Sequence, residues 1–182
     1  HRPRPLVEAS RGAVRPVALP APRSQALREL CRAEGVTPFM ALLAVWSIVL
    51  GRAAGQEDVL VGSPIAGRNR REIEDLIGFF VNTLVLRADL SGNPAFCGLL
   101  GQVRCTALSA YAHQDLPFER LVDELVPQRD LAHAPLVQVL FALQNAPVQP
   151  LAVPGLTLAP VQLDLQTSKL DLGLAFWEAA EG

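Results

Sequence analysis

Residues 77–87 read IGFFVNTLVLR, a run of Ile, Phe, Val and Leu with a single amide side chain, Asn82, near its middle. Near-continuous apolar runs are typical of strands buried on both faces, so we predict such a strand over residues 78–87. An amide inside it needs hydrogen-bond partners, because an unpaired buried polar group costs about 1–3 kcal/mol. Either Asn82 bonds to neighbouring backbone and is structural, or it faces a channel where water or a substrate amide satisfies it. Periodicity favours the structural interpretation.

Two helices are predicted before this strand. Ser24 is the expected N-cap of the first, which ends at Gly35. Thr37 is the expected cap of the second, with Pro38 at its first position. The second helix, FMALLAVWSIVLGRAAG (residues 39–55), is apolar nearly all round, which predicts a central and fully packed helix.

The remaining elements mix helical and strand patterns. DVLVGSPIAGR (58–68) indicates a strand that breaks at Gly62 and Pro64, and NRREIED (69–75) indicates a charged turn. Because helices and strands alternate before paired strands late in the chain, the predicted class is α/β or α+β, a mixed sheet with packed helices. The other predicted elements are the helices AFCGLLGQVRCTALSAYAH (95–113) and FERLVDELV (118–126), and the strands LVQVLFALQN (136–145), LTLAPVQLDL (156–165) and LDLGLAFWE (170–178).

The domain organisation follows from composition. Residues 1–22 are rich in Pro and Arg, which predicts an extended connector with one edge strand in AVRPVAL (13–19). Residues 23–182 then form one lobe. With 50% hydrophobic residues and a mean hydropathy of +0.26, that lobe can bury a substantial core.

Charge and cysteine content exclude several classes of function. The net charge of −2 and sequence pI of about 5.9 leave no basic field for nucleic acid. Cys31, Cys97 and Cys105 share no metal-ligand spacing, which predicts no metal site and favours free thiols in a reducing cytoplasm. The apolar helix over 39–50 is shorter than the roughly 20 residues that cross a bilayer, so no membrane partner is expected.

Catalytic motifs are incomplete in this chain. The sequence has no G-x-S-x-G elbow, P-loop, G-x-G-x-x-G or HExxH motif. His113 and Asp115 could act as a base and its orienting acid, although a capping cluster at a helix end is the commoner arrangement. Arg68 directly follows a Gly-flanked loop that leaves a strand, so it is a candidate for a side chain held in place.

Four segments in order, IGFFVNTLVLR, AYAHQDLPFERLVDEL, RDLAHAPLVQVLFALQN and SKLDLGLAFWE, resemble the later motifs of condensation domains of nonribosomal peptide synthetases. The earlier TPFMALLAVWSIVLGRAAGQEDVLVGSPIAGR is similar to the second-lobe helix and strand of that family. One departure is residues 132–134, Ala-His-Ala, where the family usually has Ser-Arg-Asn. The larger departure is that the catalytic His-His-x-x-x-Asp-Gly motif is absent from this sequence. The resemblance therefore implies the C-terminal lobe of a condensation domain, truncated before its last elements.

This resemblance implies a chloramphenicol-acetyltransferase-like lobe that pairs with an N-terminal lobe around a tunnel. Donor and acceptor carrier proteins would bring thioesters on phosphopantetheine, and an adenylation domain would lie next to the condensation domain, which binds no cofactor of its own. The catalytic residues would lie outside this chain, which we expect to be inactive alone. A non-catalytic docking lobe and an epimerization or cyclization relative remain as alternatives. The expected substrate-channel residues are Asn82, Phe80, Ser63 and Arg68.

Overall fold

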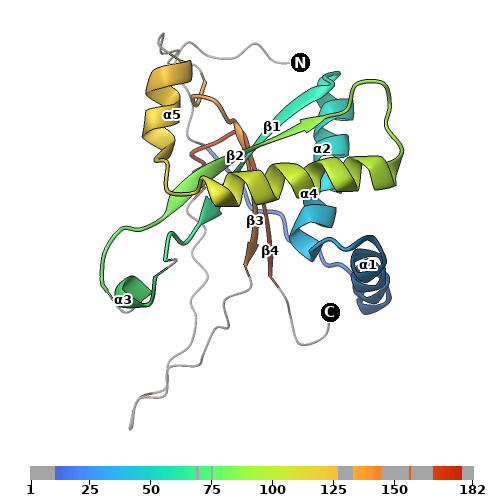
Figure 1. The fold of residues 1–182 in the computed structure, drawn as a ribbon, viewed down its shortest axis with the longest axis horizontal. Coiled ribbons are helices and arrows are strands. Elements are labelled where there is room, and N and C mark those ends of the chain that lie inside the picture. The colour runs from blue at the N-terminus through green and yellow to red at the C-terminus, as the bar shows by residue number, and fades with distance from the viewer. Residues whose placement is uncertain are drawn as a thin grey trace.

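The computed structural model of the chain describes residues 11–68, 70–74, 76–126, 133–144, 156 and 166–177. Helices and strands are mixed throughout this part, as Figure 1 shows. The elements are α1 (Ala21–Glu34), α2 (Pro38–Ala54), β1 (Asp58–Ile65), α3 (Arg71–Glu74), β2 (Asn82–Asp89), α4 (Phe96–Ala112), α5 (Phe118–Leu125), β3 (Val139–Gln144) and β4 (Leu172–Trp177).

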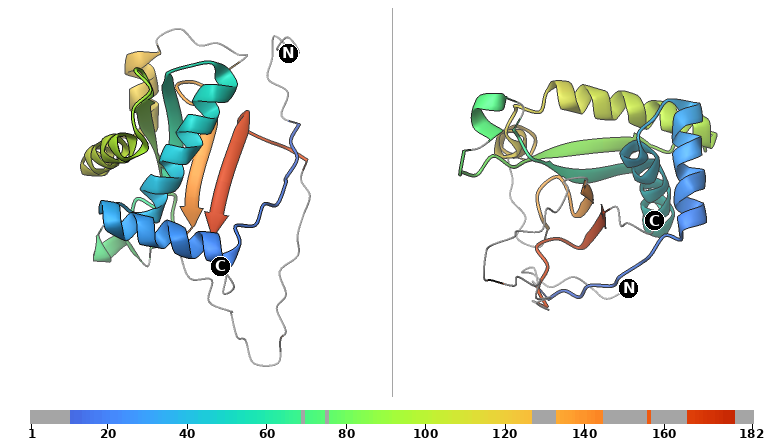
Figure 2. Two further views of the ribbon diagram at one scale, coloured as in Figure 1. Left: turned by 90° about the vertical axis from the view of Figure 1, so that its right-hand side faces the viewer. Right: turned by 90° about the horizontal axis from the view of Figure 1, so that it is seen from below.

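The strands form one mixed sheet in the order β2-β1-β3-β4. β1 and β2 are antiparallel and pair from Asp58 with Asp89 to Ile65 with Asn82. β3 runs parallel to both β1 and β4. Figure 2 shows the strands in a row from β2, which α4 covers, to β4, with α1 and α2 beside them. The predicted class, a mixed sheet with packed helices, is confirmed.

The core lies between the sheet and the helices α2 and α4. Antiparallel pairing places Val61 of β1 opposite Leu86 of β2, and both side chains are buried. Phe141 of β3 has no exposed surface. Its ring centroid lies 5.3 Å from that of Phe39 on α2 and 6.2 Å from that of Phe176 on β4. Phe141 therefore joins the helical layer to the parallel half of the sheet.

Helix α2 packs against the sheet on one side only. Leu43 and Ser47 are buried, whereas Val45 and Val49 are 45% and 49% exposed. The prediction that α2 is a core helix is confirmed, and the prediction that it is packed all round is wrong. A helix at the outside of a two-layer structure has a face without a partner layer, and here that face carries valine.

Of the two predicted helix N-caps, one is confirmed and one is wrong. Thr37 caps α2 as predicted, because its hydroxyl accepts a hydrogen bond from the backbone N–H of Met40 at 3.3 Å. Ser24 is not the cap of α1, which begins at Ala21 after Pro20. Pro22 fits in the first turn because N–H groups there have no partner within the helix. Helix α1 thus starts inside the predicted connector.

Both strands of the hairpin differ from their predictions. β2 begins at Asn82, four residues later than the predicted start at residue 78, and it alternates buried Leu84 and Leu86 with an exposed Arg87. It is an edge strand with one core face, so burial on both faces was wrong. β1 continues through Gly62 and Pro64 to Ile65. Proline is found in sheets where its missing N–H removes no ladder hydrogen bond, and Pro64 is the last residue but one of β1.

Three further predicted segments have mixed outcomes. Residues 13–19 form no strand, and an isolated bridge between Arg11 and Thr167 replaces the predicted edge strand. The predicted charged turn contains the short helix α3. The predicted strand over 156–165 lies outside the described residues except for Leu156.

Within the described ranges, no single helix has the length and apolarity of a membrane span. Helices α1 and α2 have them only when taken together, as a pair bent by 104°.

Candidate functional site

The four residues predicted for a substrate channel lie near one end of the β1–β2 hairpin. Ser63 is on β1, two residues before its end, and Asn82 is the first residue of β2. Arg68 and Phe80 lie in the connection between the two strands. The pairing of Ile65 with Asn82 closes the ladder at this end. The hairpin thus brings together residues separated by up to 19 positions in the sequence.

Asn82 uses both polar atoms of its side chain in bonds to the backbone. Its Nδ2 donates to the carbonyl oxygens of Gln114 at 2.9 Å and Leu116 at 2.8 Å. Its Oδ1 accepts from the N–H groups of Phe118 at 3.0 Å and Thr83 at 2.9 Å. These bonds attach the link between α4 and α5 to the first residue of β2.

This geometry bears directly on the two interpretations of Asn82. A primary amide offers two donor hydrogens and two acceptor lone pairs, and backbone groups engage all of them. The contacts supply the internal partners that the structural interpretation required. A substrate amide would have to displace one of them in order to bind Asn82 directly. Any channel role of Asn82 therefore acts through the backbone that it holds.

Arg68 is also held by internal contacts. Its Nη1 donates to the carbonyl oxygens of Ile73 and Glu74, the latter at 2.8 Å. These carbonyls belong to the end of α3, where helical carbonyls lack partners within the helix. The guanidinium carbon lies 4.4 Å from the centroid of the Phe80 ring, a cation–π arrangement. Arg68 thus joins the start, middle and end of the β1–β2 connection.

Gly67 makes this close packing possible. Its φ is +64°, and a Cβ built on it would lie within van der Waals overlap of the Phe80 carbonyl oxygen. The position therefore requires glycine for two independent reasons, the left-handed backbone and the close approach of another chain segment. Gly55, at the end of α2, has a similar φ of +67° but open space around its Cα.

We expect Gly67→Ala to lower the free energy of unfolding by about 2 kcal/mol, since a left-handed alanine costs about 1–2 kcal/mol and the new methyl meets backbone. Gly55→Ala is the matched control and should cost about 1 kcal/mol, because it adds only the conformational term. Urea denaturation of both variants measures the difference. Equal losses would contradict the close contact between residues 67 and 80.

The remaining candidate side chains have simpler surroundings. Ser63 is 3% exposed and pairs with Leu84 of β2. His113 ends α4, and its Nδ1 lies 2.9 Å from the carbonyl oxygen of Ser109, one turn earlier. This contact is the one expected of a helix-capping histidine. Among the described residues there is no group of three or more His, Cys, Asp or Glu side chains placed to hold a metal ion.

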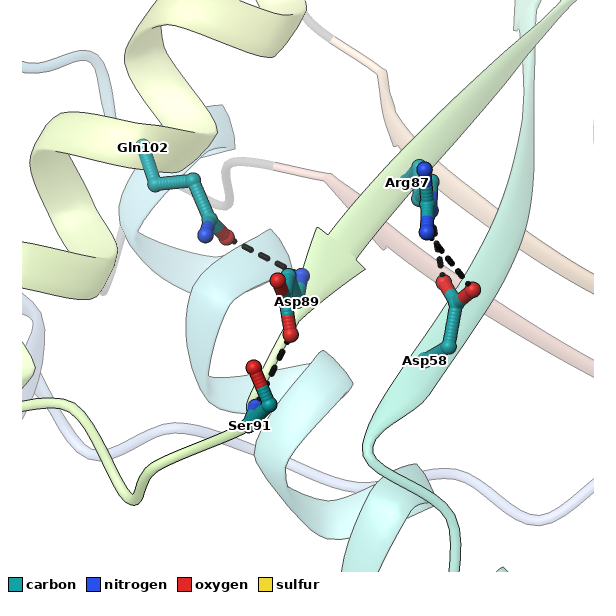
Figure 3. Close-up of polar contacts among 5 residues, drawn as sticks. All are labelled: Asp58, Arg87, Asp89, Ser91 and Gln102. Atoms are coloured by element: carbon teal, nitrogen blue, oxygen red, sulfur yellow. Dashed lines mark hydrogen bonds and ion pairs between the residues drawn. The ribbon is translucent and has the colours of Figure 1, made fainter.

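A second polar cluster lies at the opposite end of the hairpin (Figure 3). Arg87 binds Asp58 through two nitrogens, at 2.8 and 2.9 Å. The hydroxyl and the N–H of Ser91 hold the pKa of Asp89 below its ordinary value. Gln102 of α4 accepts the backbone N–H of Asp89 at 3.0 Å. Since Arg87 and Asp58 are mostly exposed, this cluster is a surface network that ties β2 to its following turn.

The lowered pKa of Asp89 predicts an acid-sensitive contribution to stability. A carboxyl whose folded pKa lies below its unfolded value stabilises the fold above the unfolded pKa, near 3.8. That contribution is lost as the pH falls through the folded pKa. We expect Asp89→Asn to reduce the fall in urea midpoint between pH 5 and pH 2.5. Glu72→Gln, an exposed carboxylate change on α3, is the control and should retain the full fall.

Sequence reasoning missed two features of the site. The α4–α5 link is the partner of Asn82, and the charged turn contains α3, whose end Arg68 caps. No local pattern indicates either feature. The Asn82 contacts join residues 32–36 positions apart, and the Arg68 contacts depend on a helix of a single turn. The Gly-flanked loop before Arg68 was the one available signal.

Comparisons with known proteins connect this chain to a family. The model of a protein family described as "Condensation domain" matches residues 4–181. The chain is 52% identical over 183 residues to one subunit of the linear gramicidin synthase of Brevibacillus parabrevis, covering all of this chain and 2% of that protein. It is 47% identical to malpinin synthetase of Mortierella alpina, covering 99% and 2% respectively. It is also 47% identical to isonitrile lipopeptide synthase of Mycobacterium tuberculosis, covering 94% and 7%.

Solved structures share the fold. A four-domain nonribosomal peptide synthetase bound to AMP and glycine superposes with a TM-score of 0.88 at 22% identity, covering 98% of this chain and 15% of that one. The X-domain from teicoplanin biosynthesis gives a TM-score of 0.76 at 22% identity, covering 96% and 43%. The neighbours include condensation domains, which have the chloramphenicol-acetyltransferase-like fold. The chain spans only a few per cent of the curated relatives that it matches.

Proposed function

We propose, from the premise that this chain belongs to the condensation-domain family of nonribosomal peptide synthetases, that it is the second half of a domain that forms amide bonds. The observation that carries the proposal is the identity of about half of its residues to peptide synthetases along the whole chain. The substrates would be aminoacyl and peptidyl thioesters carried on phosphopantetheine by a donor and an acceptor carrier protein.

The proposed reaction needs little covalent chemistry from the protein. The amine nitrogen of the acceptor attacks the thioester carbonyl carbon of the donor, so that a C–N bond forms and the C–S bond breaks. The phosphopantetheine thiolate leaves, and the proton lost by the amine neutralises it. Because both reactants are tethered, orientation and effective concentration supply much of the rate. The protein must chiefly align two chains in a shielded channel.

We propose that this chain has a structural role in aligning the two substrates. The sequence contains no His-His-x-x-x-Asp-Gly motif, so proton transfer is assigned to the N-terminal lobe of the same domain. We assign one wall of the channel to the hairpin end that carries Ser63, Arg68, Phe80 and Asn82. Within it, Asn82 holds the backbone of residues 114–118 and Arg68 holds the β1–β2 connection. Both side chains would shape the wall without touching the reacting atoms.

The proposed partners follow from this assignment. They are the N-terminal lobe, the donor and acceptor carrier proteins and an adjacent adenylation domain. The proposed location is the cytoplasm, and the free thiols of Cys31, Cys97 and Cys105 support it.

A second candidate function is a non-catalytic docking lobe. One observation supports this candidate. The X-domain from teicoplanin biosynthesis has a similar fold and was solved in complex with OxyB.

The deciding experiment compares this chain with the complete condensation domain. Both are mixed with the two carrier proteins that flank the domain in its own synthetase, each loaded with its thioester. Intact-protein mass spectrometry then follows transfer of the donor group to the acceptor carrier. We expect transfer with the complete domain and none with this chain. Transfer by this chain would contradict the half-domain assignment, and no transfer by the complete domain would support the docking function instead.

A further inference from the structure

The N-terminal end of the described chain is tied to the segment that leads into β4. Arg11 forms an isolated antiparallel bridge with Thr167, and the backbone N–H of Gly12 donates to the carbonyl oxygen of Gln166 at 2.8 Å. From this point residues 13–20 run along the β4 side of the sheet to the start of α1, as both views of Figure 2 show. We call the contact between residues 11–12 and 166–168 the Gly12 tie.

The tie is a close contact between two stretches of backbone. A Cβ atom built on Gly12 would lie 2.7 Å from the carbonyl carbon of Thr167 and 2.8 Å from the nitrogen of Ser168. Gly12 is not among the glycines with a positive φ, so the neighbouring segment alone requires glycine here. Backbone atoms cannot rotate aside as the end of a long side chain can. Any larger residue at position 12 therefore has to push the two segments apart.

The other side of the tie has an unusual backbone conformation. Gln166, whose carbonyl oxygen accepts the Gly12 N–H, has a φ of +48°, a left-handed value that non-glycine residues rarely adopt. Such a conformation persists where the surrounding structure fixes it. Two residues later, the hydroxyl of Ser168 donates to the carbonyl oxygen of Leu170 and accepts its N–H. These bonds shape the turn into β4, so the tie holds a segment with a defined course.

Residues 13–18 form a strap that α1 fixes at its other end. Ser24 of α1 is buried, and its hydroxyl donates to the carbonyl oxygen of Leu19 at 3.5 Å. Between the two fixed ends the strap is exposed throughout, with Val14 81% and Val17 79% exposed. Since the strap has little packing of its own, its course depends on the contacts at its two ends.

We infer that Gly12 is a positioning residue for the proposed reaction. Its close contact with Thr167 and Ser168 fixes the point at which the polypeptide leaves this lobe toward the N-terminal lobe. The inference rests on the proposed function, in which proton transfer is assigned to that other lobe. The strap then belongs to this lobe and moves with it, so that rotation between the lobes is confined to residues before Arg11.

The proposed reaction explains why the exit point matters. Two tethered substrates react when the two lobes hold them in line, and a misplacement of about 1 Å can cost about a hundredfold in rate even when it arises far from the chemistry. A connector that left the lobe at an undefined point would allow many lobe arrangements. A tie made by backbone contacts restricts the exit without using a side chain of the channel.

Gly12→Ala in the complete condensation domain tests the tie itself. Hydrogen exchange measured by mass spectrometry should be at least tenfold faster over residues 11–19 and 166–171 than in the unchanged domain. Gly98→Ala is the matched control, because Gly98 is exposed on α4 and a Cβ there meets nothing within 4 Å. Its exchange over the same two segments should be unchanged. Unchanged exchange in Gly12→Ala would overturn the tie.

Two readouts distinguish positioning from simple stability. In the carrier-protein assay, Gly12→Ala should lower kcat about tenfold per folded molecule, with KM for each loaded carrier unchanged and the melting temperature within about 2 °C. Spin labels on Cys105, which is exposed on α4, and on a cysteine introduced in the N-terminal lobe report the distance between lobes, with Cys97→Ser removing the other exposed thiol. We expect a broader distance distribution in Gly12→Ala.

Gln166→Gly is the second variant, and it is expected to keep the tie. Glycine adopts the left-handed conformation without strain, so exchange, kcat and the distance distribution should match those of the unchanged domain. Faster exchange in Gly12→Ala with normal kcat and normal distances would overturn the positioning role. The proposed function is judged separately, by amide formation in the unchanged complete domain. Its failure would leave the exchange and distance results readable, so the two failures are distinguishable.

Discussion

Phe141→Ala is expected to lower the free energy of unfolding by about 4 kcal/mol, the largest loss that we expect from a single substitution. Phe141 has no exposed surface and contacts both Phe39 of α2 and Phe176 of β4. Removing its ring leaves a cavity where the helical layer meets the two parallel strands, and close-packed surroundings relax only in part. Urea denaturation followed by circular dichroism measures the loss.

Phe79→Ala is the matched control for this prediction. Both variants remove the same side chain, but Phe79 is 90% exposed and lies outside the core. Its loss should change stability by about 0.5 kcal/mol or less. Similar losses for the two phenylalanines would mean that the ring of Phe141 does not fill the centre of the fold.

Asn82→Ala is expected to cost about 3 kcal/mol, because it removes four hydrogen bonds that contribute about 0.5–1.5 kcal/mol each. The bonds join β2 to the backbone of Gln114, Leu116 and Phe118. For a chain of 182 residues the melting temperature should fall by about 8 °C, since each kcal/mol lowers it by about 2–4 °C. Differential scanning calorimetry of this chain measures the shift.

Two further measurements make the Asn82 result decisive. Gln25→Ala is the control, because this amide lies on the exposed surface of α1 and bonds to Glu29 in the same helix; it should change stability by about 0.5 kcal/mol or less. Turnover per folded molecule is then measured with Asn82→Ala in the complete domain. An unchanged melting temperature with lost turnover would show that Asn82 acts on the substrate and not on the backbone.

Much of the local structure could be predicted from the sequence. Pro38 after Thr37, and Gly35 and Gly55 after the first two helical runs, indicate helix ends through single-residue conformational preferences. The amphipathic FERLVDELV segment and the run over 95–113 likewise predicted α5 and α4. These signals are local because a helix satisfies its own hydrogen bonds within a few residues of sequence.

The sequence by itself therefore determined the four longer helices, most of their ends and the mixed class of the fold. It also carried the family resemblance, since motifs that occur in a fixed order can be recognised in the sequence without knowledge of their contacts in the fold. Only the tertiary structure decided which faces are covered. Residues 77–81 and Val49 are as apolar as the core, yet they are outside it because no layer of the described residues packs over them. Burial depends on which other segment arrives, and that information is not local.

The same reason separates the two halves of the site prediction. The single amide of Asn82 in an apolar run requires hydrogen-bond partners, and this need could be predicted from the sequence. The partners themselves are backbone groups at residues 114–118, which become neighbours only when α4 packs on β2 and reverses into α5. Hydrogen-bonding need is a property of one side chain, whereas its satisfaction is a property of the folded chain.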